Sequence, residues 1–180
     1  MTERQRLVVH LGNMGQARPE ETATKTRRYA ERFPNVRFIG IDLLSRSRLL
    51  PQDGQRSNWQ QVQARFKDGL ESSVEDGSAD VISAEMSVGY YLDGKTTAAK
   101  QKELGQLLDL CHRKLKPGGK LFIVTGTDAG DRLERAFNSS KFNRYRTNRV
   151  RATGQDRTMW MSRFERMKAV NIQFSAAKER

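Results

Sequence analysis

The sequence has little cysteine, little proline and no long apolar run. One cysteine among 180 residues excludes an intramolecular disulfide and a CxxC metal site, so we expect no metal centre and a reducing compartment such as the cytoplasm. No stretch of about 18 apolar residues occurs, which predicts that no helix spans a membrane. The polar start of the chain predicts no signal peptide, and the lack of a persistent period excludes collagen-like, coiled-coil and repeat architectures.

The chain is strongly basic, and the excess charge lies at its two ends. The net charge is +12; residues 1–50 contribute +5 and residues 141–180 contribute +8, whereas residues 51–140 contribute −1. Clustered arginine at a pI near 10.3 indicates a partner that carries phosphates, and a solvated charged surface is the alternative. Aromatic residues alternate with these arginines near the C-terminus, in a pattern suited to nucleic acid, although half of them would face the core of a strand pair.

Apolar runs recur at regular intervals and alternate with helical patterns. Expected strands cover residues 7–11, 36–42, 62–67, 79–84 and 120–124, and expected helices cover residues 17–32, 95–114 and 131–138. Two further extended segments, at 142–150 and 158–167, follow one another without a helix and predict an antiparallel pair. The whole predicts a single α/β domain over residues 1–174, with a parallel sheet covered on both faces, and a flexible tail over 175–180.

Two local motifs add a family resemblance. Residues 75–82 read EDGSADVI after an acidic Asp68, and residues 112–121 read HRKLKPGGKL at the entry to the expected fifth strand. With five β/α units and a terminal hairpin, residues 6–167 resemble the class I S-adenosylmethionine-dependent methyltransferases. The resemblance implies a doubly wound, mostly parallel seven-stranded sheet with an antiparallel C-terminal hairpin, and S-adenosylmethionine as cofactor.

The resemblance places the cofactor at the carboxyl end of the first strand, where a doubly wound sheet binds ligands. The family's glycine motif is reduced to Gly12-Asn13-Met14-Gly15, preceded by His10 where the family has an acidic residue. Gly12 and Gly15 leave room for a close approach of the backbone to a ligand. His10 on a buried strand is either a packed core residue or a catalytic base.

Two aspartates follow the next strands and complete the expected cofactor site. Asp42, beside Leu43, would accept hydrogen bonds from the ribose, or it caps a turn. Asp68 with the Gly69 backbone would bind the adenine ring, or it begins a turn. The cofactor-binding residues expected from the resemblance are therefore Gly12, Asn13, Gly15, Asp42, Leu43, Asp68, Gly69 and Glu85.

The loop after the fourth strand, residues 83–91, faces the methyl acceptor in the family. Glu85 would orient or deprotonate the acceptor, or it serves as a cap; Tyr90 would stack on a flat acceptor, or it closes the edge of the core. These two are the expected catalytic residues. No Pro-Pro-aromatic motif occurs here and Cys111 belongs to the apolar face of a helix, so both common forms of DNA-base methylation are disfavoured.

The function expected from these residues is methyl transfer with RNA, either tRNA or rRNA, as acceptor. The strand at residues 38–42 is similar to that of tRNA guanine-N7 methyltransferases, but their Pro-Asp-Pro-Trp motif is missing. The alternatives are a small-molecule or protein methyltransferase, and a non-catalytic methyltransferase-like subunit that binds RNA or a protein partner. A dinucleotide-binding oxidoreductase would use Gly12 and Asp42 in the same positions, and residues 91–95 match the Tyr-x-x-x-Lys spacing of short-chain dehydrogenases. The motif at 112–121 and the terminal hairpin are not explained by that class of enzyme.

Overall fold

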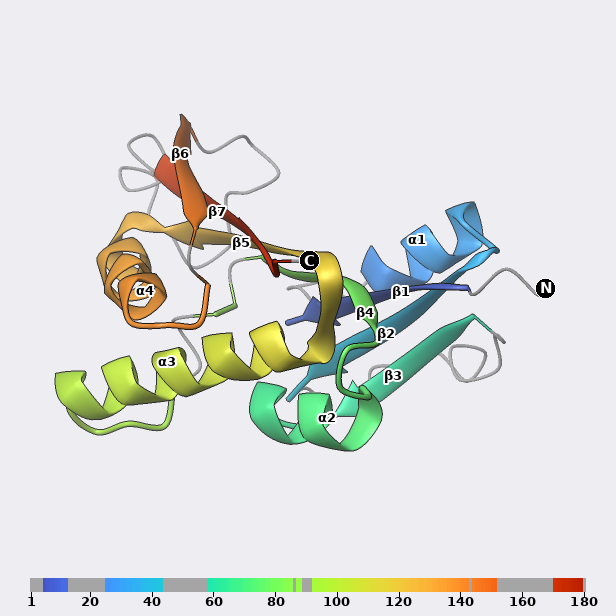
Figure 1. Cartoon of the computed structure of the whole chain (residues 1–180), viewed down its shortest axis with the longest axis horizontal. Coiled ribbons are helices and arrows are strands. Elements are labelled where there is room, and N and C mark those ends of the chain that lie inside the picture. The colour runs from blue at the N-terminus through green and yellow to red at the C-terminus, as the bar shows by residue number, and fades with distance from the viewer. Residues whose placement is uncertain are drawn as a thin grey trace, which may run out of the picture.

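Within the residues that the structure describes, seven strands form one mixed sheet (Figure 1). The computed structural model describes residues 5–12, 25–43, 58–85, 87–88, 92–142, 144–151 and 170–179. The strands are β1 (Arg6–Leu11), β2 (Val36–Asp42), β3 (Trp59–Gln63), β4 (Ala79–Glu85), β5 (Leu115–Gly126), β6 (Tyr145–Arg151) and β7 (Val170–Ala177). They lie in the order β3-β2-β1-β4-β5-β7-β6, with β1 to β5 parallel and β7 antiparallel to both β5 and β6. The expected doubly wound sheet with an antiparallel C-terminal hairpin is confirmed.

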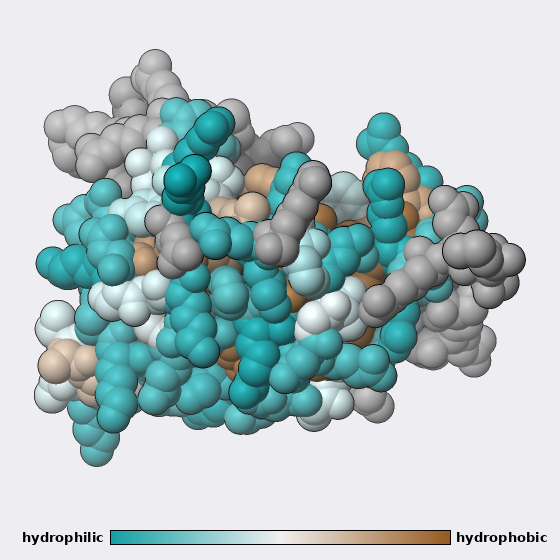
Figure 2. All heavy atoms as spheres, viewed as in Figure 1, coloured by the Kyte–Doolittle hydropathy of each residue, from teal (hydrophilic) through white to brown (hydrophobic). Residues whose placement is uncertain are grey.

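Four helices accompany this sheet in the described residues. They are α1 (Lys25–Arg32), α2 (Phe66–Ser73), α3 (Thr97–Lys114) and α4 (Thr127–Asn138). Helix α1 lies on one face, against β2, and the other three lie on the opposite face (Figure 1). The surface in this view is dominated by hydrophilic residues (Figure 2), and no helix within the described residues is long and apolar enough to cross a bilayer.

The KPGG motif, residues 116–119, lies at the start of β5, directly after α3, and the structure explains why these residue types occur there. Helix α3 carries His112, Arg113 and Lys114 in its last turn, where cations complement the helix dipole. Gly118 has φ +77°, and a Cβ on Gly119 would lie 2.9 Å from the Ala79 carbonyl oxygen, so glycine fits both positions.

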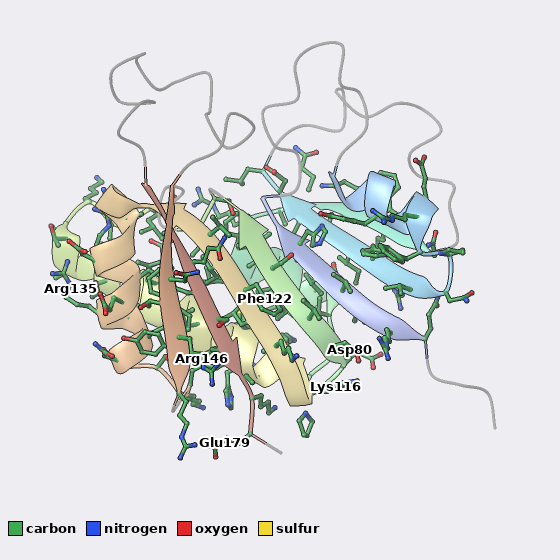
Figure 3. The ribbon with its side chains drawn as sticks, turned by 90° about the horizontal axis from the view of Figure 1, so that it is seen from above. Asp80, Lys116, Phe122, Arg135, Arg146 and Glu179 are labelled. Carbon is green, nitrogen blue, oxygen red and sulfur yellow. The ribbon has the colours of Figure 1, made fainter. Side chains whose placement is uncertain are left out.

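Lys116, the first residue of this motif, forms an ion pair with Asp80 near the start of β4 (Figure 3). The other oxygen of Asp80 accepts the Leu7 N–H at 2.9 Å. Partial burial alone would raise the pKa of Asp80, but the Lys116 ammonium and the Leu7 N–H outweigh it and hold that pKa below its ordinary value. The ionised form of Asp80 therefore stabilises the fold.

We expect the Asp80→Asn variant to lose less stability than the wild type under acid conditions. A carboxyl group with a lowered pKa in the folded state contributes stability above its ordinary pKa, and that contribution is lost as the pH falls through the folded value. The free energy of unfolding, measured by denaturant titration from about pH 5 to about pH 2, should fall more steeply in the wild type. Parallel profiles for the two proteins would contradict the assignment.

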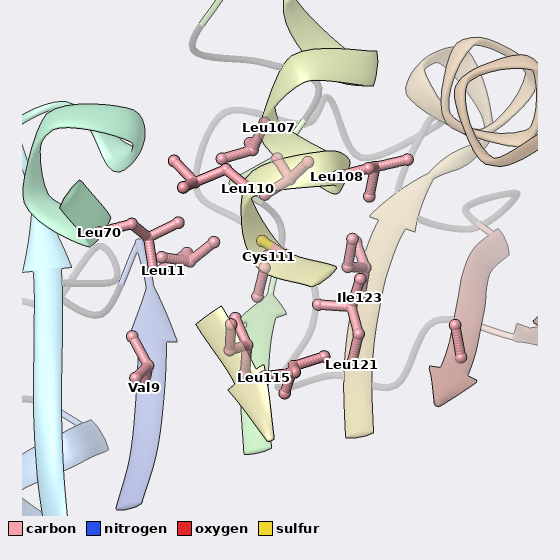
Figure 4. Close-up of a cluster of buried hydrophobic side chains, with 14 of the residues drawn as sticks. Val9, Leu11, Leu70, Leu107, Leu108, Leu110, Cys111, Leu115, Leu121 and Ile123 are labelled. Atoms are coloured by element: carbon pink, nitrogen blue, oxygen red, sulfur yellow. The ribbon is translucent and has the colours of Figure 1, made fainter. Parts of the chain in front are cut away.

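The core lies between the sheet and α3. The apolar stripe expected on the 95–114 helix is present, and it packs onto inward side chains of β1 and β5 (Figure 4). Its fully or nearly fully buried members are Leu104, Leu107, Leu108, Leu110 and Cys111. Beside them Phe137 of α4 stacks on Phe174 of β7, with ring centroids 5.4 Å apart. These contacts fix α3 and α4 on the same face of the sheet.

Several expected segments differ from the structure; the fifth strand and the helix expected at 131–138 begin earlier, at Leu115 and Thr127. The third strand is β3, Trp59–Gln63, and not residues 62–67, because Phe66 already begins α2. The partner of β6 is β7, Val170–Ala177, whereas the expected segment 158–167 lies outside the described residues. Residues 175–177 are part of β7, and the Lys178 N–H donates to the Gly119 carbonyl at 3.0 Å, so this stretch is held in the sheet where a tail was expected.

Candidate functional site

The carboxyl end of β1 is held by contacts from both neighbouring strands. The sheet reverses its order between β1 and β4, which is where open α/β sheets bind ligands. The Gly12 N–H donates to the Ile41 carbonyl at 2.9 Å. Ser87, which is buried, donates its hydroxyl to the Leu11 carbonyl at 2.8 Å. This serine follows β4 and ties its loop to the end of β1, a contact that nothing in the local sequence announces.

Gly12 occupies a position where no other residue fits without a shift. Its φ is +73°, and a Cβ placed there would lie 2.2 Å from the Ser87 Cβ. The same Cβ would lie 3.6 Å from the Phe66 ring, so the end of β1 lies close to the start of α2. The predicted partners Asn13 and Gly15, like Met14, lie outside the described residues.

His10 is part of an aromatic cluster on the face covered by α1. Its ring meets Tyr29 edge-on with centroids 5.5 Å apart, and it meets Phe38 at 6.1 Å. Tyr29 and Phe38 in turn stack on each other. Of the two roles considered for His10, the geometry favours packing.

The two predicted aspartates come from β2 and α2. Asp42 ends β2, half-buried and in register with Gln63 of β3. Asp68 lies in the first turn of α2 and not in a loop after a strand, because the strand ends earlier than expected. A carboxylate in this first turn stabilises the helix dipole. Among the described residues the exposed Asp68 carboxylate has no hydrogen-bond or ion-pair partner, so it remains available to a ligand.

Gly69 serves packing and does not line a cavity. A Cβ on Gly69 would lie 2.4 Å from Cγ2 of Ile41, so its absence allows α2 to approach β2 closely. The Gly69 N–H already donates to the Arg65 carbonyl at 2.8 Å inside the helix. The Gly69 backbone N–H, which lies in the stretch expected to bind the adenine ring, is therefore already hydrogen-bonded within the helix.

A cavity of about 240 Å³ opens where β2, α2 and α3 meet. It is lined by Leu43, Arg65, Phe66, Lys67, Asp68, Val88, Leu92, Asp93, Glu103 and Leu107. Val88 follows the serine bound to the end of β1, so the cavity adjoins the switch point. Its volume lies just below the roughly 300–1,000 Å³ of whole-ligand pockets, and suits part of a ligand, such as a base with its sugar.

Polar groups hold one wall of the cavity in place. Arg65 forms an ion pair with Asp93, and Glu103 of α3 accepts the Asp93 and Gly94 N–H groups at 2.9 and 3.1 Å. The carboxylates of Glu103 and Asp93 therefore already have partners within the protein. The Asp68 carboxylate has none among the described residues. Lys95 lies before α3 begins, so the helical turn that the dehydrogenase spacing requires is not formed there.

The acceptor side of the site is described only in part. Glu85 ends β4 in register with Val124 of β5, and nothing is described of its side chain. Tyr90 lies outside the described residues. In the part of the chain that the structure describes, no three His, Cys, Asp or Glu side chains gather to hold a metal ion.

Cys111 is expected to be inert. The thiol is 1% exposed, and burial raises its pKa to about 12, which keeps it protonated and un-nucleophilic. At about pH 8 Ellman's reagent should leave the native protein unreacted and should titrate one thiol after denaturation. Rapid reaction of the native protein would contradict this burial and reopen cysteine-based chemistry.

Of the comparisons with known proteins, the one with solved structures supports the fold. Neither the protein-family models nor the curated proteins match the sequence. Among solved structures, the chain is similar to phosphoethanolamine N-methyltransferase 2 of Haemonchus contortus, bound to S-adenosylhomocysteine, with a TM-score of 0.62 and 13% identity. That match covers 100% of this chain and 50% of the other, so the chain spans half the length of that enzyme.

Two further similar structures are of enzymes whose names state other methyl acceptors. The 16S rRNA (adenine(1408)-N(1))-methyltransferase of Catenulisporales acidiphilia matches with a TM-score of 0.58 and 16% identity, over 98% of this chain and 89% of that one. Geranyl diphosphate C-methyltransferase of Streptomyces coelicolor A3(2) matches with a TM-score of 0.63 and 12% identity, over 96% and 69%. The chain thus has the class I methyltransferase fold that the motif at 112–121 predicted.

Proposed function

We propose that this chain is an S-adenosylmethionine-dependent methyltransferase that binds the adenosyl part of its cofactor in the cavity beside β1. The observation that carries the proposal is the cavity itself, which lies near the edge of the sheet where the strand order reverses. Apolar and charged side chains line it together, and among the described residues the Asp68 carboxylate in this lining has no partner. Neighbours of the same fold have been crystallised with S-adenosylhomocysteine, which supports the choice of cofactor.

The lining residues suit a flat, partly polar group such as adenosine. Phe66, Val88 and Leu92 offer apolar contact to a purine ring, and the Asp68 carboxylate can accept a hydrogen bond from an amino or hydroxyl group. At the neighbouring strand end Asp42 would accept hydrogen bonds from ribose hydroxyls, and the Gly12–Gly15 loop, with Asn13, would pass close to the methionine part.

When bound, the cofactor supplies an electrophilic methyl group on a sulfonium. The work of the chain is then to hold the acceptor atom about 3 Å from that methyl, in line with the bond that breaks, and to take up any proton. Glu85, which ends β4, and Tyr90, five residues further along the chain, are the residues that we propose for orienting the acceptor and receiving the proton.

RNA is the acceptor that we favour. The net charge of +12 supports a partner with a phosphate backbone, and one structural neighbour is an rRNA methyltransferase. The other neighbours are named for small acceptors, which makes a small-molecule methyltransferase the competing form of this proposal. Transfer of labelled methyl from S-adenosylmethionine to total RNA, with a small-molecule extract as the parallel substrate, separates the two. Label in neither fraction would contradict both.

The Asp42→Ala variant is expected to bind S-adenosylmethionine more weakly by about 1–3 kcal/mol, the cost of losing hydrogen bonds to a charged group. Calorimetric titration of the folded variant measures this loss. Asp131→Ala, which removes an exposed carboxylate from α4, is the matched control and should bind as the wild type does. If both variants bind equally, the ribose does not lie at the end of β2.

A non-catalytic methyltransferase-like subunit is the second candidate, and one observation favours it. The family's acidic residue at the end of β1 is replaced by His10, whose ring packs edge-on against Tyr29 and Phe38. Such a protein would bind RNA or a protein partner but would give no heat with S-adenosylmethionine at millimolar concentration.

A further inference from the structure

One face of the sheet lacks a covering helix among the described residues. Leu121 and Ile123 of β5 point into the core beneath α3, so the alternating residues Lys120 and Phe122 point to the opposite face. Helix α1 lies on that face over β1, β2 and β3, and Figure 3 looks directly onto the open strands β4, β5, β7 and β6. Phe122 lies in the middle of this open face with 41% of its surface exposed, unusual for a large aromatic residue on a central strand.

The strand register places a cation in the same row as this ring, two strands away. Phe122 is opposite Ser175 of β7, and Ser175 is opposite Arg146 of β6, so the three share one row across the open face. The next row contains Val124, Gln173 and Asn148. The last two are exposed amides, which offer both donors and acceptors.

Charge on this face has one sign in the described side chains. Lys120 and Arg146 are exposed, and no ion pair joins either of them to a carboxylate among the described side chains. The row that contains Val124 continues to Glu85 of β4, because these two residues are in register. Glu85 ends β4 and is the residue that we propose for orienting the acceptor. A strand of nucleic acid lying across the face would therefore reach the proposed acceptor site.

We infer that this open face, defined by Lys120, Phe122, Gln173, Ser175, Arg146 and Asn148, is a docking surface for single-stranded RNA. A base stacks on the Phe122 ring, Lys120 and Arg146 contact phosphates, and the amides and the hydroxyl bond to sugar or base edges. The inference deepens the proposed function, because it rests on RNA as the acceptor. It adds a surface outside the cofactor cavity; of its two basic residues, Lys120 lies outside the basic chain ends and Arg146 belongs to the C-terminal one.

The test measures binding of a fluorescent single-stranded oligouridine to the full chain by anisotropy at several salt concentrations. Phe122→Ala should weaken binding about 5- to 150-fold, the effect of one lost base–aromatic stack. The double variant Lys120→Gln with Arg146→Gln should reduce the slope of log K against log salt by about 1.4, since each phosphate contact on a single strand contributes about 0.7.

Matched controls come from the same chain. Phe33→Ala removes an aromatic ring with 45% exposure beyond the end of α1, and Arg135→Gln removes an exposed arginine from α4, on the other side of the sheet (Figure 3). Both should bind the oligonucleotide within about twofold of the wild type, well below the loss of one stack. Equal losses in Phe122→Ala and Phe33→Ala, or an unchanged salt slope in the double variant, would overturn the inference.

Two further readings keep this result distinct from the proposed function. A wild-type dimer that Phe122→Ala dissociates, seen by light scattering without any change in RNA binding, would make the face a protein interface and overturn the inference. S-adenosylmethionine binding, measured on the same variant, should be unchanged. If RNA binds through Phe122 while the cofactor does not bind, the enzyme proposal fails and the docking surface stands.

Discussion

The Gly12→Ala variant is expected to lose about 2–5 kcal/mol of folding stability. A left-handed backbone costs a residue with a Cβ about 1–2 kcal/mol, and overpacking adds about 1–3 kcal/mol. Both costs apply here, because φ is +73° and the new Cβ would lie 2.2 Å from that of the buried Ser87. The loss follows from denaturant unfolding of the two proteins at the same pH.

Gly77→Ala separates the two contributions. Gly77 has φ +68°, close to that of Gly12, and nothing lies within 4 Å of the position where its Cβ would be. Only the backbone cost of about 1–2 kcal/mol is expected there. If the two variants are equally stable, the Ser87 contact does not hold the end of β1 against the loop after β4.

The Leu92→Trp variant is expected to bind S-adenosylmethionine at least about 100-fold more weakly, a loss of about 2.7 kcal/mol. Leu92 is half-buried and lines the cavity of about 240 Å³, so an indole in its place takes up space that a purine would need. Because the side chain is not fully buried, the larger residue should cost less than about 1.5 kcal/mol of stability.

Leu92→Met provides the matched control for this change. The substitution conserves volume and apolar character, so both stability and cofactor binding should stay close to those of the wild type. Calorimetric titrations of the two variants, with thermal unfolding as the test of folding, separate blockage from misfolding. If Leu92→Trp binds the cofactor as tightly as Leu92→Met, the cavity is not the adenosyl site.

The strands that the sequence predicts well are those whose residues form continuous apolar runs. Continuous apolar runs mark β1, β2 and β4, and an apolar stripe marks α3, because burial on a sheet or beneath a helix selects such patterns directly. The third strand was misplaced for the same reason. Residues 59–63 contain three glutamines, and the apolar alternation that follows them ends at Phe66, which begins a helix without a side-chain cap.

The parts of the site that the sequence could not predict depend on distant contacts. Asp68, which we predict to bind the adenine ring, lines the cavity, but its position in a helix depends on where β3 ends. Gly69 resembles a ligand-binding glycine in sequence, and only the approach of Ile41 reveals its packing role. Ser87 donates to Leu11, 76 positions away in the chain. Strand β7 pairs with β5 although α4 and β6 lie between them in the sequence, so neither contact has a local signal in the sequence.

The most direct test of the account is a calorimetric titration of the full chain with S-adenosylmethionine. The account predicts one binding site with micromolar affinity, weakened by Asp42→Ala and abolished by Leu92→Trp. No heat at millimolar ligand from a folded wild-type protein would contradict it.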